Sequence, residues 1–173
     1  MTEKIFVDTN IFVYMHDSGH PAKSRTAGEV LARLWREQSG RTSFQVLNEL
    51  YVTLTRKLVR KVSPEQAWDA VETLLAWEPQ STDRELLVRA KQIEQRYRLS
   101  WWDSLIVSAA QLQDCDVLLS EDLQAGMAFG SVTVVNPFLA GVRDLEATYA
   151  PIQRLPSRHR SRGRPRKVLR EQL

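Results

Sequence analysis

The sequence of 173 residues predicts an α/β fold in which a short parallel sheet is covered by helices. Two short apolar runs, KIFVD at residues 4–8 and DVLLSED at 116–122, are typical of buried strands, and both end in acidic residues. Long segments with helical spacing of apolar residues separate these runs, as expected for helices that connect parallel strands. The predicted architecture is therefore an α/β sandwich.

The remaining elements follow from local patterns along the chain. A helix capped by Thr9 or Asn10 follows the first strand, and a second helix is expected at 22–38. A short strand and a helix at 44–59 come next. Three helices begin with a capping pattern, namely Ser63 with Gln66 (to residue 77), Thr82 with Glu85 (to 97) and Ser100 with Asp103 (to 113). Strands within 116–122 and 131–138 and a short helix at 144–149 complete the prediction.

Composition divides the chain into a domain at 1–150 and a basic tail at 151–173, which we expect to be disordered when unbound. The tail has eight Lys or Arg residues and one acid, a net charge of +7, whereas the body has a net charge of −4. Cys115 is the single cysteine, which excludes an internal disulfide and suits a reducing cytoplasm. No signal peptide or membrane span is evident.

Four acidic residues stand at positions where chemistry concentrates in such folds. Asp8 and Asp122 follow the two apolar strands, and sites in open parallel sheets form at the carboxyl ends of strands. Asp103 begins a buried helix, and Glu49 lies beside an apolar helical stripe. Each has a structural alternative: Asp103 as a helix cap, Glu49 as a solvated side chain, Asp8 and Asp122 as loop residues. Together they predict an acidic cluster.

A cluster of carboxylates requires a balancing cation, because like charges in a small space otherwise force protonation. Oxygen ligands suit Mg²⁺ or Mn²⁺, which can assist phosphodiester cleavage. Zinc is disfavoured, because the chain has no cysteine pair and Ser18, Gly19 and Pro21 break the helix that would align His16 with His20.

The segments FVDTN, VLNELYVTLTRK, LSWWDSLIVSAA and VLLSEDLQAG occur in the order and spacing that resemble the PIN-domain family, especially its VapC-like toxin ribonucleases. The resemblance covers about residues 4–138. It implies a PIN-like three-layer sandwich and Mg²⁺- or Mn²⁺-dependent cleavage of single-stranded or looped RNA. It further implies a homodimer and a cognate antitoxin protein that covers the acidic cluster.

Carried over residue by residue, the resemblance assigns catalysis and metal binding to four acids: Asp8, Glu49, Asp103 and Asp122. Thr9, Asn10 and Ser120 match polar positions that support these acids. All four acidic positions are filled, which implies an active enzyme. Trp101 and Trp102 are interpreted as core residues in preference to a platform for a nucleobase.

The tail departs from this resemblance. SRGRPRK, at residues 161–167, is similar to an AT-hook, which lies in the minor groove of DNA, but a less specific arm for RNA or DNA is the preferred interpretation. The basic residues assigned to nucleic-acid binding are Arg158, Arg160, Arg162, Arg164, Arg166 and Lys167.

Other classes of function remain as alternatives to a nuclease. In a binding module without catalysis, the acids are structural and the tail binds nucleic acid. Phosphatases of the haloacid dehalogenase type also begin with a strand that ends in Asp, but they need a second Asp two residues later, where this chain has Asn10. A nucleotide-binding switch is disfavoured because no glycine-rich phosphate loop is present.

Overall fold

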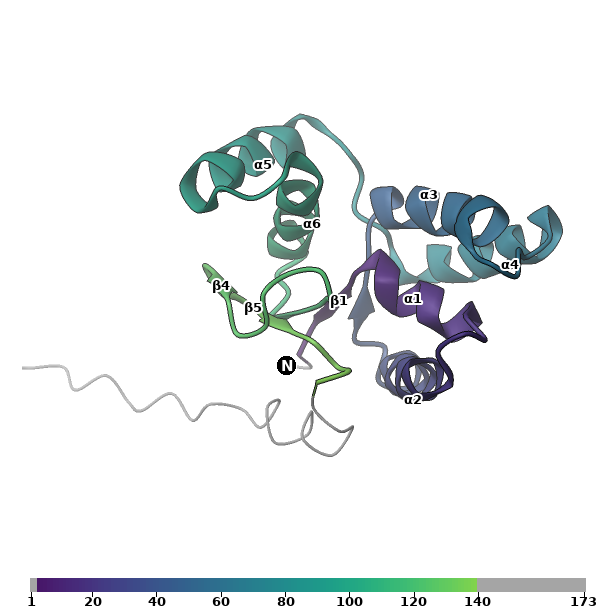
Figure 1. The fold of residues 1–173 in the computed structure, drawn as a ribbon. Helices are drawn as coiled ribbons and strands as arrows, with labels where there is room; N and C mark the ends of the chain where they lie inside the picture. Colours follow the sequence, from purple (N-terminus) through teal and green to yellow (C-terminus); the bar gives the residue numbers. More distant parts are fainter. Residues whose placement is uncertain (1–2, 140–173) are drawn as a thin grey trace, which may run out of the picture.

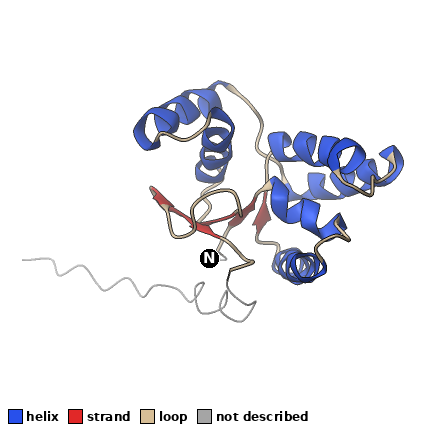
Figure 2. Ribbon diagram, viewed as in Figure 1, coloured by secondary structure: helices blue, strands red, loops and turns tan. Residues whose placement is uncertain are grey.

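The computed structural model describes residues 3–139, in which a five-stranded, mostly parallel sheet is flanked by six α-helices (Figures 1 and 2). The strands are β1 (Ile5–Val7), β2 (Gly40–Arg41), β3 (Val117–Leu119), β4 (Ala128–Phe129) and β5 (Val132–Val135). The helices are α1 (Thr9–His16), α2 (Pro21–Glu37), α3 (Phe44–Val52), α4 (Pro64–Leu74), α5 (Arg84–Tyr97) and α6 (Trp101–Leu112). A π-helix, η1 (Thr53–Lys57), extends α3, and a 3-10 helix, η2 (Leu75–Trp77), extends α4.

The strand order is β2-β1-β3-β5-β4, and only the last pair is antiparallel. β1 and β3 lie side by side in the centre, with Val7 opposite Leu119. Both strands are buried along their whole length, which explains their uninterrupted apolar sequences. The carboxyl ends of β1 and β3 therefore meet at one edge of the sheet, as the sequence predicted for an α/β fold.

The helices form two groups around the sheet (Figure 1). α5 packs along α6, and α6 contacts β3 and β5. α1 contacts α2 and α3, and α3 contacts α4. Where α5 packs on α6, the Ser108 hydroxyl donates a 2.9 Å hydrogen bond to the Leu86 carbonyl, so this buried polar group is satisfied.

A cluster of three aromatic rings packs beside β2. The Trp77 ring lies 5.6 Å from the Phe12 ring and 5.2 Å from the Trp35 ring. A Cβ atom at Gly40 would lie 2.5 Å from the Trp77 ring, so only glycine allows the indole to pack against this strand.

Two predicted helices change their geometry near the end. The helix expected at 44–59 is α-helical only to Val52 and continues as the π-helix η1, in which the Leu58 amide donates to the Thr53 carbonyl. The Thr55 hydroxyl donates to the Tyr51 carbonyl at 2.7 Å, a bond that competes with the α-helical ladder. The helix expected to reach residue 77 ends as the 3-10 helix η2.

Two predicted caps were wrong. Asp8, and neither Thr9 nor Asn10, is the N-cap of α1, where it accepts a hydrogen bond from the Thr9 amide. Asp83 replaces Thr82 as the cap of α5, because its carboxylate accepts from the Leu86 amide at 2.9 Å. The predicted caps Ser63 and Ser100 are confirmed.

The sheet is not wholly parallel, because β4 and β5 form a hairpin that the sequence analysis missed. Gly130 has a φ of +65° between these two strands, a conformation that favours glycine at a tight turn. The helix expected at 144–149 lies outside the described residues, as does the tail with its six assigned basic residues. Within 3–139, no helix combines the length and apolar character needed to cross a bilayer.

Candidate functional site

The junction between β1 and α1 places Asp8 at the centre of the candidate site. Asp8 follows β1 directly, and its amide donates to the Leu119 carbonyl of β3 at 3.0 Å. This bond joins the two strand ends. Asp8 is 8% exposed, which is unusual for a residue whose carboxylate forms no ion pair within residues 3–139.

Three donors surround the Asp8 carboxylate. Oδ1 accepts from the Thr9 amide at 2.7 Å, and Oδ2 accepts from the Ser120 hydroxyl at 2.7 Å. The Asn10 side-chain amide also donates to Oδ2, at 3.2 Å. These bonds fix the carboxylate in one orientation and satisfy it despite burial.

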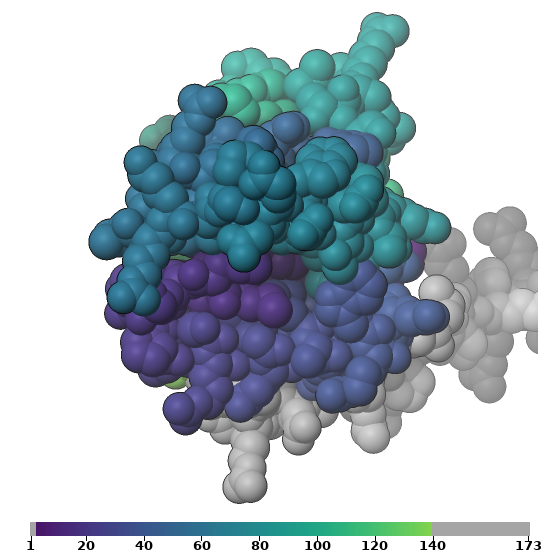
Figure 3. Space-filling model, turned by 90° about the vertical axis from the view of Figure 1, so that its right-hand side faces the viewer, coloured from purple at the N-terminus to yellow at the C-terminus, as the bar shows by residue number. Residues whose placement is uncertain are grey.

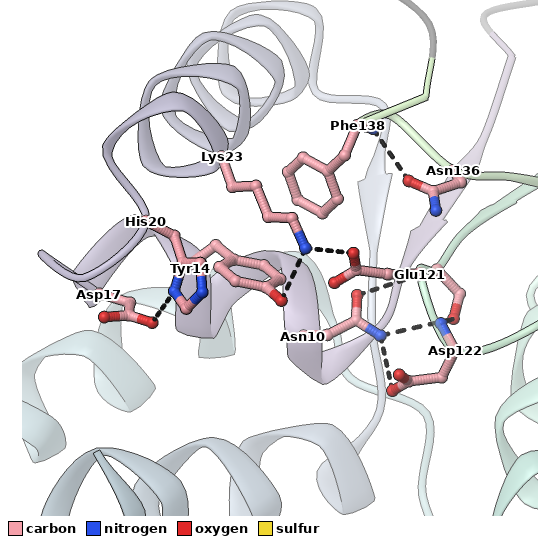
Figure 4. A network of polar contacts seen from close by, with 10 residues as sticks. Asn10, Tyr14, Asp17, His20, Lys23, Glu121, Asp122, Asn136 and Phe138 are labelled. Carbon is pink, nitrogen blue, oxygen red and sulfur yellow. Dashed lines mark hydrogen bonds and ion pairs between the residues drawn. The ribbon is translucent and has the colours of Figure 1, made fainter. Parts of the chain in front are cut away.

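Asn10 and Ser120 connect Asp8 with Asp122, which is exposed after β3. The Asn10 Nδ2 atom donates to Asp122 Oδ2 at 3.0 Å, and the Asn10 Oδ1 atom accepts from the Glu121 amide at 3.3 Å (Figure 4). The Ser120 Oγ atom accepts from the Asp122 amide at 3.2 Å. Asn10 thus holds two carboxylates at once, a role that an aspartate at this position would not fill.

Glu49 reaches the same region from α3. The Thr9 hydroxyl donates to Glu49 Oε2 at 2.7 Å, and the Gln45 amide donates to Oε1 at 2.9 Å. The sequence analysis did not identify Gln45, although its position four residues before Glu49 predicts an interaction on one helix face. Glu49 is half-buried and oriented, in contrast to the solvated side chain that was the alternative.

Burial and the neighbouring acids together change the acidity of Asp8. Burial raises the pKa of Asp8 to about 6, and the charges of Asp122 and Glu49 act in the same direction. The hydrogen bonds from Ser120 and Thr9 partly oppose this rise. An Asp8 carboxylate in this environment gains from any cation that enters the site.

Asp103 is not connected to this network. The Ser100 hydroxyl donates to Asp103 Oδ2 at 2.7 Å and accepts from the Asp103 amide at 3.1 Å. This is the capping interaction that the sequence analysis kept as an alternative. The structure therefore links three predicted acids through hydrogen-bonded side chains and leaves the fourth in its own cap.

A second polar cluster, which sequence reasoning missed, lies beside the first. Lys23 of α2 forms an ion pair with Glu121, and its Nζ atom donates to the Tyr14 hydroxyl at 3.0 Å (Figure 4). The ammonium also lies 4.5 Å from the centre of the Tyr14 ring and 5.4 Å from that of Phe138. Burial acts to raise the pKa of Glu121, but Lys23 outweighs it and holds this pKa below its ordinary value. Lys23 therefore balances the charge of Glu121, whereas Asp122 has no ion-pair partner among the described residues.

A cleft of about 910 Å³ opens over the network. Its walls include Thr9, Asn10, Glu49, Glu121 and Asp122, together with Thr53 and Lys57 of η1 and Trp102 and Leu105 of α6.

The two tryptophans at the start of α6 differ in their exposure to solvent. Trp101 packs against the core, as predicted, but Trp102 is 63% exposed and lines the cleft, contrary to its interpretation as a core residue.

The donors fit a hard divalent cation by their chemistry. Asp8, Glu49 and Asp122 offer carboxylate oxygens, and burial, with a smaller effect of the neighbouring acids, raises the pKa of Asp8 and so makes its negative charge unfavourable without a cation. Within residues 3–139, however, no three Asp, Glu, His or Cys side chains already converge as metal ligands. Binding would therefore require side-chain rotation, for which the exposed Asp122 is free of tight packing.

We compared the sequence with models of known protein families. The PIN-domain family model matches residues 5–126, which include the strand ends and all four predicted acids. The chain belongs to the PIN-domain family. The resemblance inferred from the sequence is confirmed. A search of curated proteins gives no significant match.

Solved structures support this fold for the PIN domain. A toxin–antitoxin complex from Klebsiella pneumoniae matches with a TM-score of 0.57 and 21% identity, over 78% of this chain and 98% of the other. The Mycobacterium tuberculosis VapC20 toxin, described as cleaving the sarcin–ricin loop, matches with a TM-score of 0.54 and 21% identity, over 69% of this chain and 90% of the other. At this identity the likeness establishes the fold alone.

Proposed function

We propose that this PIN domain is a metal-dependent endoribonuclease that hydrolyses RNA phosphodiester bonds. The observation that carries the proposal is the hydrogen-bonded network joining Asp8, Asn10, Ser120 and Asp122 at adjacent strand ends. A purely structural aspartate would not need a buried position with a pKa raised to about 6. Burial of an ionisable carboxylate costs free energy, and this favours a functional explanation for Asp8.

The metal-binding residues we propose are Asp8, Glu49 and Asp122, with Asp103 as the fourth. Mg²⁺ or Mn²⁺ bound there would supply charge neutralisation and a more acidic water for attack on phosphorus. The Ser100 hydroxyl donates to Oδ2 of Asp103, so Asp103 could take part through Oδ1 or by giving up this bond. Its neighbours Trp102 and Leu105 line the cleft, so the start of α6 borders the site.

The polar residues of the chain prepare the carboxylates for this role. Ser120 and the Thr9 amide hold Asp8 in one orientation, and both lower its pKa, so they favour the ionised form that a cation requires. Asn10 sets the position of Asp122 relative to Asp8. The Thr9 hydroxyl does the same for Glu49. We expect loss of any one to weaken activity less than loss of an acid.

The biological role we propose is that of a cytoplasmic toxin in a toxin–antitoxin pair. One structural match is itself a toxin–antitoxin complex and another is an RNA-cleaving toxin, which supports this class of role. A cognate antitoxin protein that covers the acidic cluster and a homodimer are part of the proposal. The basic tail would add a non-specific arm for RNA or DNA.

The test is cleavage of a labelled total-RNA pool by the purified full chain with Mg²⁺, with Mn²⁺ and with EDTA. We expect metal-dependent fragments from the wild type and a loss of more than about 100-fold in Asp8→Ala, since even residues that only orient metal ligands contribute 10- to 100-fold. Folding of the variant is checked by circular dichroism.

Fragments that persist in EDTA or in Asp8→Ala would refute metal-dependent catalysis at this site. Retained RNA binding without any cleavage by the wild type would favour the alternative of a binding module that acts through its tail. Growth arrest on expression, relieved by Asp8→Ala, separates a toxin from a nuclease with another role.

A further inference from the structure

A second basic surface lies in the described part of the chain, far in sequence from the tail. Residues 50–64 contain four basic residues and no acid, although the body as a whole is acidic. The four are Arg56, Lys57, Arg60 and Lys61, here called the basic segment, and all are exposed. Among the ion pairs and side-chain hydrogen bonds within residues 3–139, none involves these four side chains.

The backbone holds the basic segment in a defined position. The π-helix η1 is closed by the Leu58 amide, which donates to the Thr53 carbonyl at 3.1 Å. The Val62 amide then returns to the Leu54 carbonyl at 3.0 Å, which ties the loop back onto the helix. Leu54 is fully buried, whereas Val59 at the tip is fully exposed. The four cations are therefore presented by an anchored turn, and π-helical turns are frequent at functional sites.

The basic segment adjoins the acidic network. Lys57 lines the same cleft as Glu49, and Thr53 lies between them along the helix. Eight residues at 1.5 Å per residue separate Lys57 from Glu49 by roughly 12 Å along the helix axis. In Figure 3, the blue segment around residue 60 lies directly beside the purple α1, and η1 contacts α1. The lining of the cleft thus contains an acid, Glu49, and a base, Lys57, about two helical turns apart.

We propose that the basic segment binds the phosphate backbone of the RNA and guides the strand to the acidic network. This proposal rests on the proposed function, because it assigns the substrate a path into that site. A polyanion that approaches Asp8, Glu49 and Asp122 is repelled by them, so nearby unpaired cations are needed to hold it. Lys57 supplies one of them in the cleft lining, and the other three cations of the basic segment lie within four residues of it along the chain.

The lining of the cleft favours RNA over an acidic protein as the ligand. Trp102 is 63% exposed in the same cleft and offers an aromatic face. Cations that follow the backbone, combined with aromatic rings on which bases stack, are the usual features of single-strand binding. An acidic peptide would use the cations but would gain little from the exposed indole.

The test measures binding of a fluorescein-labelled 20-nucleotide single-stranded RNA to the full chain in EDTA, at several salt concentrations. The test variant is Lys57→Gln with Arg60→Gln. The matched control is Arg36→Gln with Arg96→Gln, which removes the same charge from exposed sites on α2 and α5 outside the cleft lining. We expect the test variant to reduce the slope of log K against log salt by about 0.7 for each phosphate that the protein no longer neutralises.

The control separates a local effect from a change in net charge. We expect its slope and affinity to stay close to those of the wild type, while the test variant binds roughly 5- to 20-fold more weakly at low salt. A third variant, Lys57→Arg with Arg60→Lys, keeps both positive charges. It should bind the RNA as tightly as the wild type. Equal slopes for test and control variants would overturn the proposal. Because binding is measured without cleavage, this outcome does not depend on whether the chain is a nuclease.

Discussion

Asp8 and Asp103 both stand at the start of a helix, yet their surroundings differ in every respect that governs reactivity. Asp8 is buried, accepts bonds from Thr9, Asn10 and Ser120, and has a pKa raised to about 6. Asp103 is partly exposed, and its hydrogen bonds to side chains of residues 3–139 stay within its own cap. A helix N-terminus stabilises either carboxylate, so the cap alone does not distinguish a functional acid from a structural one.

The difference teaches that the neighbouring strand decides the role of an acid at a helix start. β3 lies beside β1 and delivers Ser120 and Asp122 to Asp8, whereas α6 begins after the short loop that follows α5. Within residues 3–139, the Asp103 carboxylate accepts one hydrogen bond, from the Ser100 hydroxyl to Oδ2, whereas both oxygens of Asp8 accept hydrogen bonds. The orientation of Asp8 is therefore set more firmly than that of Asp103.

The largest expected effect is on metal binding. Mn²⁺ at 100 times its Kd should raise the unfolding free energy of the wild type by about 3 kcal/mol, which is roughly 10 °C in Tm for a domain of this size. Asp8→Asn should abolish this shift, because it removes the oriented charge. Asp103→Asn should retain part of it. Differential scanning fluorimetry of both variants, each against its own EDTA control, makes the measurement.

An equal loss of Mn²⁺-induced stabilisation in Asp8→Asn and Asp103→Asn would contradict the distinction drawn between the two acids. It would mean that both acids bind the metal and contribute similarly to its affinity. Full retention in Asp103→Asn would instead remove Asp103 from the proposed ligand set.

A smaller effect concerns pH in the metal-free protein. The folded-state pKa of Asp8, about 6, lies above its ordinary value of 3.8. The folded protein therefore binds this proton more tightly than the unfolded chain, and stability is lost as pH rises from 4 through 6. Relative to Asp8→Asn, the wild type should lose up to about 3 kcal/mol across this range. Urea unfolding in EDTA at pH 4, 5, 6 and 7 measures the difference.

Titration of the Asp8 carboxyl carbon by NMR provides an independent check. A midpoint below pH 4 would contradict the role assigned to burial. Ser120→Ala removes a hydrogen bond that lowers this pKa, so its midpoint should move higher still.

The sequence predicted the parts of the site that depend on local order along the chain. Asp8, Ser120 and Asp122 follow apolar strands, and their meeting needs only that β1 and β3 be parallel neighbours. Lys23 could not be found in this way, because its ion pair with Glu121 joins residues 98 positions apart through the packing of α2. The π-helix was equally hidden, since the apolar spacing of residues 44–59 is the same for an α-helix that continues to the end.

The smallest expected effect tests whether Ser100 competes with metal for Asp103. Ser100→Ala removes a cap and should cost about 1 kcal/mol of stability. Because it also frees the Asp103 carboxylate, Mn²⁺ affinity should rise by a few fold if Asp103 is a ligand. Ser63→Ala is the matched control, since Ser63 caps α4 in the same way and is absent from the cleft lining. It should cost similar stability and leave Mn²⁺ affinity unchanged. A fall in affinity in Ser100→Ala would mean that this serine orients Asp103 for the metal, and the cap would then belong to the site.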